Sequence, residues 1–434
     1  MSQQINLTGV KAYPSYEEII EEYSKELTKY VLPKGDTTFG FWMQTIADLE
    51  LLDLELKGLT EEYSIDPINR IVRFKDDNEF IRSRVAHLER VNGVQTLYSD
   101  IIDEFGDTNA YAFHNLYPYK GKFYPRIVRT LINAFKLKDN SLLLDPFNGS
   151  GTTTHEASLM GIKSVGVDIT PIGVILAELK NDLLFINEDS LDFSPEDLMN
   201  ILQKIENKEW EHDNPTIYKL MLIIYFDTLD AFTRTSRYDR KGKLGLFIEK
   251  FNYVKECFQK IMKIKERYGL KFEPACIIQD DVLELQKFNY MRGSFDAVIT
   301  SPPYYFSIDY VGKDKIAYDY LGINMKDIEG KYLGMKNKAN VRTSYGKLPF
   351  RVVMYYEDLK KSIENIFWAL KPEGRLAIIV GDSTVYGKKI PTTMMTKKFC
   401  EDIGFKFEKL VFNPLLGARN RAIRGEAILI FKKR

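Results

Sequence analysis

The stretch SLLLDPFNGSGTTTHEASLMGIKSVGVDITP, residues 141–171, decides the fold. An apolar run ends at Asp145, a glycine-rich turn and a helical stretch follow, and a second apolar run ends at Asp168. Short apolar runs that are bounded by turn residues indicate buried strands. The stretch therefore predicts a strand, a turn, a helix and a second strand, which together make a βαβ unit.

Further apolar runs follow the same rhythm along the chain. They are PACIIQDDVLEL (274–285), SFDAVITSPPY (294–304), GRLAIIVGDS (374–383), FKFEKLVFN (405–413) and EAILIFKK (426–433). Strands that alternate with helices predict an α/β fold with a doubly wound, mostly parallel sheet. The last two runs are expected to close the sheet as antiparallel strands.

The 434 residues exceed one ordinary core, so we expect an enlarged or divided architecture. Residues 1–110 are predicted to form a mostly helical N-terminal region, because residues 16–31 place apolar side chains at helical spacing. Residues 111–434 are predicted to form the sheet domain. A charged, helical insertion interrupts it at about 190–272 and is a candidate for target recognition.

Composition narrows the function classes. The chain carries 61 basic and 61 acidic residues, so its global charge does not favour a nucleic-acid partner. Local basic clusters that could grip phosphates are Arg234, Arg237, Arg240, Lys241 and Lys243 in the insertion, and Arg419, Arg421 and Arg424 near the end. A solvated charged face is an equally good interpretation of these clusters.

The sequence also indicates in which cellular compartment the protein is expected. The first residues lack a basic patch followed by an apolar run, and no apolar stretch reaches the length of a membrane span. Cys257, Cys276 and Cys400 are far apart and have neither disulfide nor zinc spacing. We therefore expect a cytoplasmic protein in a reducing compartment, with no membrane partner and no metal site.

The glycine turn predicts a nucleoside site. Gly149 and Gly151 let a ligand approach the backbone, and the following helix presents free N–H groups. About 20 residues further on, Asp168 ends a strand and is placed to accept hydrogen bonds from ribose hydroxyls. A third glycine and a Gly-Lys-Ser/Thr ending are missing, which favours a nucleoside without phosphates. Asp280 or, preferably, Asp281 at the end of the next strand could bind the adenine amino group.

The segment VITSPPY (298–304) ends a strand at a rigid corner. Pro302 and Pro303 fix two φ angles and leave carbonyl oxygens that need partners. Ser301 adds a hydroxyl and Tyr304 adds an aromatic face. An amino group on a planar base fits this set, because Ser301 and the Pro302 carbonyl can accept its hydrogens while Tyr304 stacks on the ring.

DPFNGSGTT, GVDI and TSPPY, in this order and at strand ends, resemble the S-adenosylmethionine-dependent amino-group DNA methyltransferases. HNLYPYKGKFYPRIV (114–128) resembles the segment that covers the methionine end of the cofactor in that family, and the likeness spans residues 111–434 apart from the insertions. Many relatives carry the glycine turn after the corner, in permuted order, whereas this chain has it before. A Ser-Pro-Pro-Tyr corner is typical of cytosine-N4 enzymes, and Asp-Pro-Pro-Tyr of adenine-N6 enzymes.

The resemblance implies a seven-stranded Rossmann-like sheet, S-adenosylmethionine as cofactor and duplex DNA as partner. A restriction–modification context, with a separately acting endonuclease, would also follow. The implied catalytic residues are Ser301, Pro302, Pro303 and Tyr304. The implied cofactor contacts are Phe123, Asp145, Pro146, Phe147, Gly149, Ser150, Gly151, Thr152, Asp168, Ile169, Asp281 and Thr300.

Other functions remain open on the sequence. The same corner could serve adenine N6 or the amino group of an RNA base, and the protein could be a regulator that binds cofactor or DNA without catalysis. Methylation at cytosine C5 is disfavoured, because that reaction needs a nucleophilic cysteine, typically after a proline, and none of the three cysteines follows one. His114 is the histidine with a modest claim to line the site.

Overall fold

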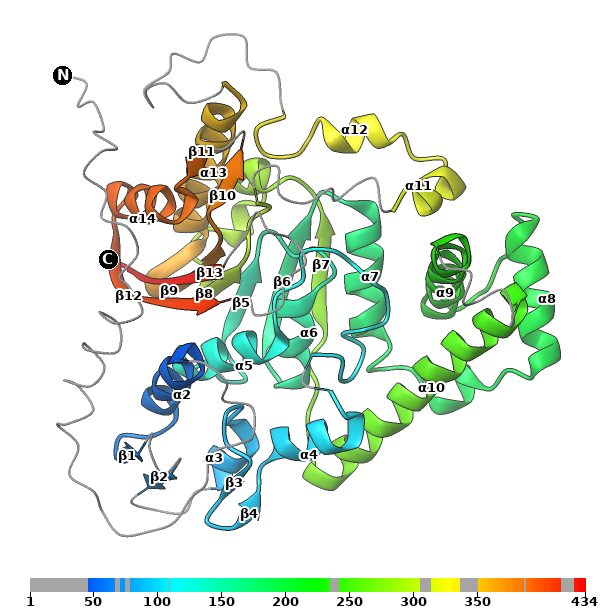
Figure 1. Ribbon diagram of the computed structural model, residues 1–434, viewed down its shortest axis with the longest axis horizontal. Helices are drawn as coiled ribbons and strands as arrows, with labels where there is room; N and C mark the ends of the chain where they lie inside the picture. Colours follow the sequence, from blue (N-terminus) through cyan, green and yellow to red (C-terminus); the bar gives the residue numbers. More distant parts are fainter. Residues whose placement is uncertain are drawn as a thin grey trace.

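The computed structural model describes residues 46–66, 71–74, 79–107, 109–234, 242–304, 314–335, 350–385, 388–414 and 425–434. Its centre is a seven-stranded sheet with the order β12-β13-β9-β8-β5-β6-β7 (Figure 1). The strands are β5 (Leu142–Asp145), β6 (Lys163–Asp168), β7 (Ala275–Gln279), β8 (Phe295–Thr300), β9 (Leu370–Val380), β12 (Phe405–Pro414) and β13 (Gly425–Lys433).

The strand directions confirm the predicted α/β sheet. β5 pairs in parallel with β6 and β8, β6 with β7, and β8 with β9. β13 lies antiparallel to both β9 and β12, so it is the strand that reverses direction. The carboxyl ends of the parallel strands therefore meet along one edge of the sheet, which is where doubly wound folds bind ligands.

Alternate residues of the strands enter two different cores. Leu143, Ala297 and Ile299 face one side, and Leu144 and Val298 face the other. This two-residue period gives each face its own buried layer. On the first side lie α2 (Ile46–Leu59), α5 (Pro125–Ala134) and α6 (Thr152–Leu159), and on the second side lie α13 (Phe350–Ala369) and α14 (Thr392–Ile403). α7 (Pro171–Asp182) packs beside α6, against β6 and β7.

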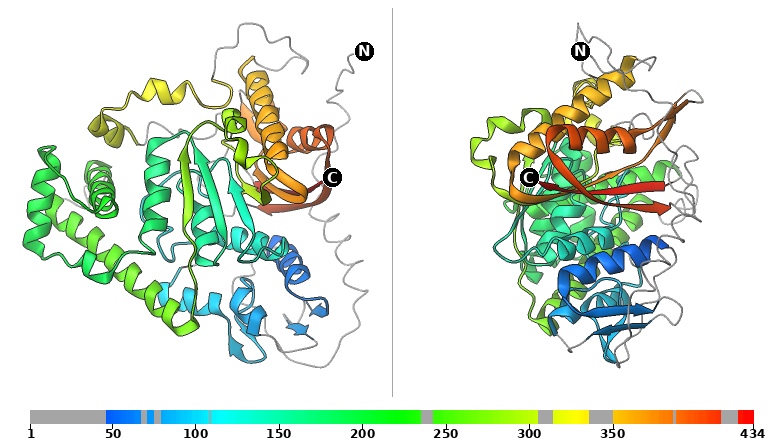
Figure 2. Two further views of the ribbon diagram at one scale, coloured as in Figure 1. Left: turned by 180° about the vertical axis from the view of Figure 1, so that it is seen from behind. Right: turned by 90° about the vertical axis from the view of Figure 1, so that its left-hand side faces the viewer.

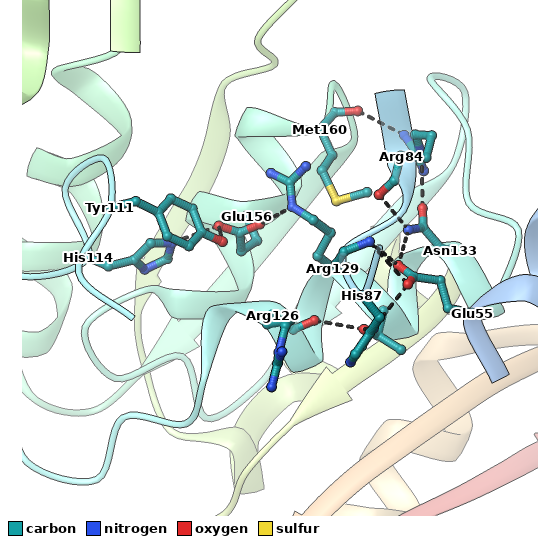
Figure 3. Close-up of polar contacts among 12 residues, drawn as sticks. Glu55, Arg84, His87, Tyr111, His114, Arg126, Arg129, Asn133, Glu156 and Met160 are labelled. Atoms are coloured by element: carbon teal, nitrogen blue, oxygen red, sulfur yellow. Dashed lines mark hydrogen bonds and ion pairs between the residues drawn. The ribbon is translucent and has the colours of Figure 1, made fainter. Parts of the chain in front are cut away.

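The described part of the N-terminal region packs against α5. It contains α2, β1 (Tyr63–Asp66), β2 (Ile71–Phe74), α3 (Glu79–Arg84), β3 (Arg90–Val91), β4 (Val94–Gln95) and α4 (Leu97–Phe105). Glu55 of α2 is fully buried and accepts a hydrogen bond from the Asn133 amide of α5 at 2.7 Å (Figure 3). It also accepts from the Ala86 N–H at 2.9 Å. Buried polar contacts of this kind fix one packing arrangement, so this region is joined to the sheet.

The insertion forms three helices beside the β7 edge, at the opposite end of the sheet from β12 (Figure 2). They are α8 (Pro195–Glu206), α9 (Pro215–Arg234) and α10 (Gly242–Tyr268), after the short helix η2 (Glu188–Leu191). α9 packs on α7, and α10 packs on α4. Arg267 of α10 also lies 2.9 Å from Asp100 of α4, so the insertion contacts the N-terminal region. None of the described helices is long and apolar enough to cross a bilayer.

Short elements connect the longer helices and strands. They are η4 (Val282–Lys287), η5 (Asn289–Met291), α11 (Lys315–Leu321), α12 (Met325–Glu329), β10 (Ser383–Val385) and β11 (Lys388–Ile390). The helix expected over residues 16–31 lies outside the described residues. So do Arg237, Arg240 and Lys241 of the first basic cluster, and the whole second cluster, Arg419, Arg421 and Arg424.

Candidate active site

The glycine turn and the Pro-Pro corner follow two neighbouring strands. β5 and β8 pair in parallel, with Leu143 opposite Ala297 and Leu144 opposite Val298. At their ends the hydroxyl of Thr300 donates to the Asp145 carboxylate at 2.6 Å. The two motifs therefore lie side by side at one edge of the sheet, as the order of the strands predicts.

Asp145 is buried beneath this edge. Its carboxylate also accepts a hydrogen bond from the Phe147 N–H at 3.1 Å. Burial raises the pKa of Asp145 from 3.8 to about 6, although the hydrogen bond from Thr300 opposes the rise. The group ties β5, the turn and β8 together, and its position behind the turn suits a supporting role better than direct ligand contact.

The glycine turn is closely packed against α7. Gly149 and Gly151 have φ angles of +48° and +79°, which favour glycine. A Cβ atom on Gly151 would lie 2.8 Å from the Cβ of Ala177, closer than side chains can approach. Ser150 between them is buried and faces inward. The turn thus presents backbone at its surface, and the Ser150 side chain lies behind it.

Asp168 ends β6 and holds the turn. Its carboxylate accepts from the Gly149 N–H at 2.7 Å, from the Thr170 N–H at 2.8 Å and from the Thr170 hydroxyl at 2.5 Å. Burial raises its pKa, and these hydrogen bonds oppose the rise. An ionised carboxylate has about four acceptor positions, so Asp168 can still accept from a ribose hydroxyl.

The end of β7 lies next to the end of β6. Asp168 pairs in register with Gln279, and the Asp280 N–H donates to the Asp168 carbonyl at 2.9 Å. Asp281 caps η4 by accepting from the Leu283 N–H at 2.9 Å, and Asp280 forms an ion pair with Lys287. The two acidic strand ends therefore flank one position, and a nucleoside spanning β6 and β7 could contact both.

Residues 111–124, which we call the covering segment, lie over the glycine turn. A Cβ atom on Gly149 would lie 3.3 Å from the Tyr119 ring, and the Tyr119 hydroxyl lies 3.3 Å from the Thr170 hydroxyl. Tyr117 donates to Asp314 at 2.9 Å, which links the segment to the chain beyond the corner. The family resemblance implies a covering role for residues 114–128, but it does not single out Tyr119 and Thr170.

Glu156 of α6 anchors the covering segment through Tyr111 and His114 (Figure 3). Its carboxylate is fully buried and accepts from the Tyr111 hydroxyl at 2.6 Å, lies 2.8 Å from His114 Nε2, and accepts from Arg129 Nε at 3.0 Å. Arg129 and the other partners hold the pKa of Glu156 below its usual range despite burial. Burial lowers the pKa of His114 to about 4. His114 thus supports the segment through Glu156.

Three elements hold the Pro-Pro corner. The Ser301 hydroxyl donates to the Ile379 carbonyl of β9 at 3.1 Å, and the Tyr355 hydroxyl of α13 donates to the Pro303 carbonyl at 3.0 Å. The Tyr304 hydroxyl donates to Glu426 of β13 at 2.8 Å. The sequence indicates the corner but not these partners, because Tyr355, Ile379 and Glu426 lie far along the chain.

Phe123 is expected to contact the cofactor and Lys243 to contact DNA phosphates, but the structure gives both side chains other partners. Phe123 is buried in the core between α5 and the sheet, in one cluster with Ile127 and Ile299. Lys243, the member of the first basic cluster whose side chain is described, forms an ion pair with Glu206 of α8. Its charge therefore helps to fasten α10 to α8.

Several known proteins are similar to this chain. A family model described as DNA methylase, of the N6/N4 type, matches residues 6–174, which include the glycine turn. The type II methyltransferase M.BsoBI of Geobacillus stearothermophilus is 23% identical, over 77% of this chain and 86% of its own length. The type II methyltransferase M.AvaI of Nostoc sp. is 19% identical, over 73% of this chain and 86% of its own.

Among solved structures, the TTHA0409 protein of Thermus thermophilus, in complex with S-adenosyl-L-methionine, is similar to this chain. It is 22% identical over 35% of this chain and 51% of its own, with a TM-score of 0.21. The sequence relatives extend over most of both chains, and the glycine turn and the Pro-Pro corner meet at one edge of the sheet. The chain is therefore similar over most of its length to type II DNA methyltransferases, and its first part matches the N6/N4 DNA methylase family model.

Proposed function

We propose that this protein is a site-specific DNA methyltransferase that methylates the N4 amino group of a cytosine flipped out of duplex DNA. The observation that carries the proposal is the junction between the two motifs. The Thr300–Asp145 hydrogen bond joins the strand before the corner to the strand before the glycine turn. A base at the corner and a cofactor at the turn would therefore be neighbours.

The corner suits an amino group. Ser301 donates its own hydrogen to Ile379, so its oxygen lone pairs stay available to accept one from the base. No described residue donates to the Pro302 carbonyl, which can accept the second hydrogen. The lone pair of cytosine N4 is delocalised into the ring. Two acceptors that favour a pyramidal nitrogen would make it more nucleophilic and would stabilise the developing positive charge.

Tyr304 gives the corner its aromatic surface. The side chain is 8% exposed and its hydroxyl is held by Glu426, so stacking on a base requires part of the surrounding chain to uncover the ring. Stacking is worth about 1–3 kcal/mol per base, which is comparable to the cost of extruding a base from the duplex. Tyr304 would therefore offset much of that cost.

S-adenosylmethionine supplies the methyl group on a sulfonium sulfur. Asp168 and the glycine turn would hold its nucleoside part, with Asp281 near the adenine amino group. The Lys180 amine meets the glycine turn from behind and is buried, and Asp168 retains acceptor capacity, so these residues fit a nucleoside with ribose hydroxyls. Their task is orientation, because a direct displacement gains much of its rate from correct alignment.

The choice of cytosine N4 over adenine N6 rests on the Ser-Pro-Pro-Tyr form of the corner. The test is to incubate the protein with duplex DNA and labelled S-adenosylmethionine, and to analyse the nucleosides by mass spectrometry. N4-methylcytosine supports the proposal. N6-methyladenine alone would assign the same chemistry to adenine, and labelled RNA without labelled DNA would move the substrate class to RNA.

Two variants link the product to the corner. Ser301→Ala removes an acceptor and Tyr304→Ala removes the ring, while the glycine turn stays intact. We expect both to lose methyl transfer and to retain binding of S-adenosylhomocysteine. A wild-type protein that binds DNA and cofactor but yields no methylated nucleoside would instead be a non-catalytic regulator. Sequencing the DNA of an expressing host would give the recognised sequence, and protection of that sequence from a cognate endonuclease would establish restriction–modification.

A further inference from the structure

Lys180 of α7 is a buried amine without an acidic partner among the described residues. Its side chain has no exposed surface. Its Nζ atom donates to the Ser150 carbonyl at 2.8 Å and lies 3.3 Å from the Ser150 hydroxyl. The positive charge of Lys122 is near enough to disfavour a second positive charge on Lys180. Burying an ammonium without a counter-charge costs several kcal/mol, so these surroundings favour the uncharged amine, which can still donate to the Ser150 carbonyl.

The helix aims Lys180 at the glycine turn. Ala177 lies three residues before Lys180, on the same side of α7, and its small side chain lets Gly151 approach. Side chains on a helix lean toward its N-terminus, and α7 begins beside the turn. The long stem of Lys180 therefore runs past Ala177 and reaches Ser150 from behind.

Both polar groups of one peptide unit are thereby fixed. The carbonyl of Ser150 accepts from Lys180, and the N–H of Gly151 in the same peptide donates to the Asn148 carbonyl at 2.8 Å. This peptide lies at the tip of the turn, where Gly149 and Gly151 both have φ angles in the left-handed region. Glycines alone leave such a turn free to take several conformations, and the two hydrogen bonds select one.

The surroundings accommodate an uncharged amine. His155 of α6 is fully buried, and neither of its ring nitrogens has a hydrogen-bond partner among the described residues. Burial lowers the pKa of Lys180 well below its usual range, and it lowers the pKa of His155 in the same way. Glu156, the acid on the same helix, is already engaged by Tyr111, His114 and Arg129.

We propose that Lys180 is a positioning residue for the cofactor, holding the Ser150–Gly151 peptide in the orientation in which the glycine turn binds S-adenosylmethionine. The inference rests on the proposed cofactor role of the turn and adds a residue to it that lies 30 positions further along the chain. Preorganisation of this kind lowers the ordering cost of binding, so its loss appears first in the affinity for the cofactor.

The test compares three variants of the full-length protein. Lys180→Met keeps the stem and removes the donor, Lys180→Gln keeps an N–H donor without the charge, and Lys204→Met makes the same change on the exposed face of α8 as a control. Titration calorimetry with S-adenosylhomocysteine measures affinity. Hydrogen exchange of residues 147–155 measures the order of the turn, and thermal unfolding measures the stability of the whole protein.

We expect S-adenosylhomocysteine to bind Lys180→Met at least about tenfold more weakly than wild type, with faster exchange confined to the turn. Lys180→Gln should recover part of the affinity, and Lys204→Met should match wild type. Binding of Lys180→Met within about twofold of wild type would overturn the proposal, as would failure of both Lys180 variants to fold, which would make the residue structural. If wild type itself does not bind S-adenosylhomocysteine, the proposed function fails instead.

Discussion

The hydroxyl of Tyr304 donates a 2.8 Å hydrogen bond to Glu426, a residue 122 positions further along the chain. Tyr304 ends the Pro-Pro corner after β8, and Glu426 lies in β13, two strands away across β9. Both side chains are nearly buried, and burial raises the pKa of Glu426 while the hydrogen bond opposes the rise. The antiparallel strand β13 therefore helps to set the position of the aromatic ring that we expect to meet the base.

Tyr304→Phe keeps that ring and removes the hydroxyl. The buried Glu426 then loses a donor, so we expect the free energy of unfolding to fall by about 1–3 kcal/mol. Methyl transfer should fall mainly through a higher KM for DNA, because the ring persists but is no longer held. Urea denaturation and initial-rate kinetics measure the two effects. Tyr290→Phe, at a tyrosine that is 69% exposed, is the matched control. Unchanged stability and KM would contradict a positioning role for this contact.

The Glu156 network predicts a large effect on stability. Glu156→Ala removes the carboxylate that neutralises Arg129 and leaves a buried guanidinium uncompensated. Breaking a buried pair from one side costs about 3–5 kcal/mol. Urea denaturation should therefore show a much lower free energy of unfolding, whereas Glu196→Ala on the exposed face of α8 should change it little. The double variant Glu156→Leu with Arg129→Met should recover part of the loss, and a double variant as unstable as the single one would argue against charge as the cause.

The sequence predicts the parts of this site that depend on local order. Asp145, Asp168 and Ser301 could be identified because each ends an apolar run, and the ends of parallel strands meet at one edge. Tyr355 and Glu426 could not, because they reach the corner through helix packing and an antiparallel pairing that only the folded chain defines. Lys180 looks in the sequence like an ordinary basic residue at the end of a helix.

The region expected to be mostly helical before residue 110 also holds two hairpins. One of them turns at Asn92 and Gly93, whose φ angles are +50° and +77°. An Asn-Gly pair between short apolar runs is a strong hairpin signal, so β3 and β4 could have been recognised from the sequence. β1 and β2 carry no such signal in the described residues, and their pairing depends on packing against α2.

Replacing Gly151 by alanine would carry two costs, a strained backbone conformation and a steric clash, and comparison with Gly269 can separate them. Gly151→Ala would force a non-glycine residue into a left-handed conformation and would place its Cβ 2.8 Å from Ala177. Gly269→Ala imposes a similar conformation, with a φ of +59°, but meets no atom within 4 Å. We expect Gly269→Ala to cost about 1 kcal/mol of stability and to leave binding of S-adenosylhomocysteine unchanged. Gly151→Ala should lose that binding. Equal affinities in the two variants would show that close packing of the turn on α7 does not matter for the cofactor.

The raised pKa of Asp145 predicts how stability depends on pH. Its ordinary pKa is 3.8 and its value in the folded protein is about 6, so between these values the folded protein holds more protons than the unfolded chain. The contribution of Asp145 to the free energy of unfolding therefore falls as the pH rises from about 4 to about 6. His114 acts in the opposite direction over the same range, because burial lowers its pKa from 6.5 to about 4. The wild-type profile alone therefore cannot isolate Asp145.

The difference between wild type and Asp145→Asn can isolate it, since asparagine still accepts from Thr300 but does not titrate. We expect the variant to gain stability relative to wild type between about pH 4 and about pH 7. The gain should be on the order of 3 kcal/mol, at about 1.4 kcal/mol for each unit between the two pKa values. Urea denaturation across this range measures it, and Asp327→Asn, at an exposed carboxyl on α12, provides the control. Parallel profiles for wild type and Asp145→Asn would mean that Asp145 ionises normally in the fold, and its burial beneath the turn would then carry no electrostatic cost.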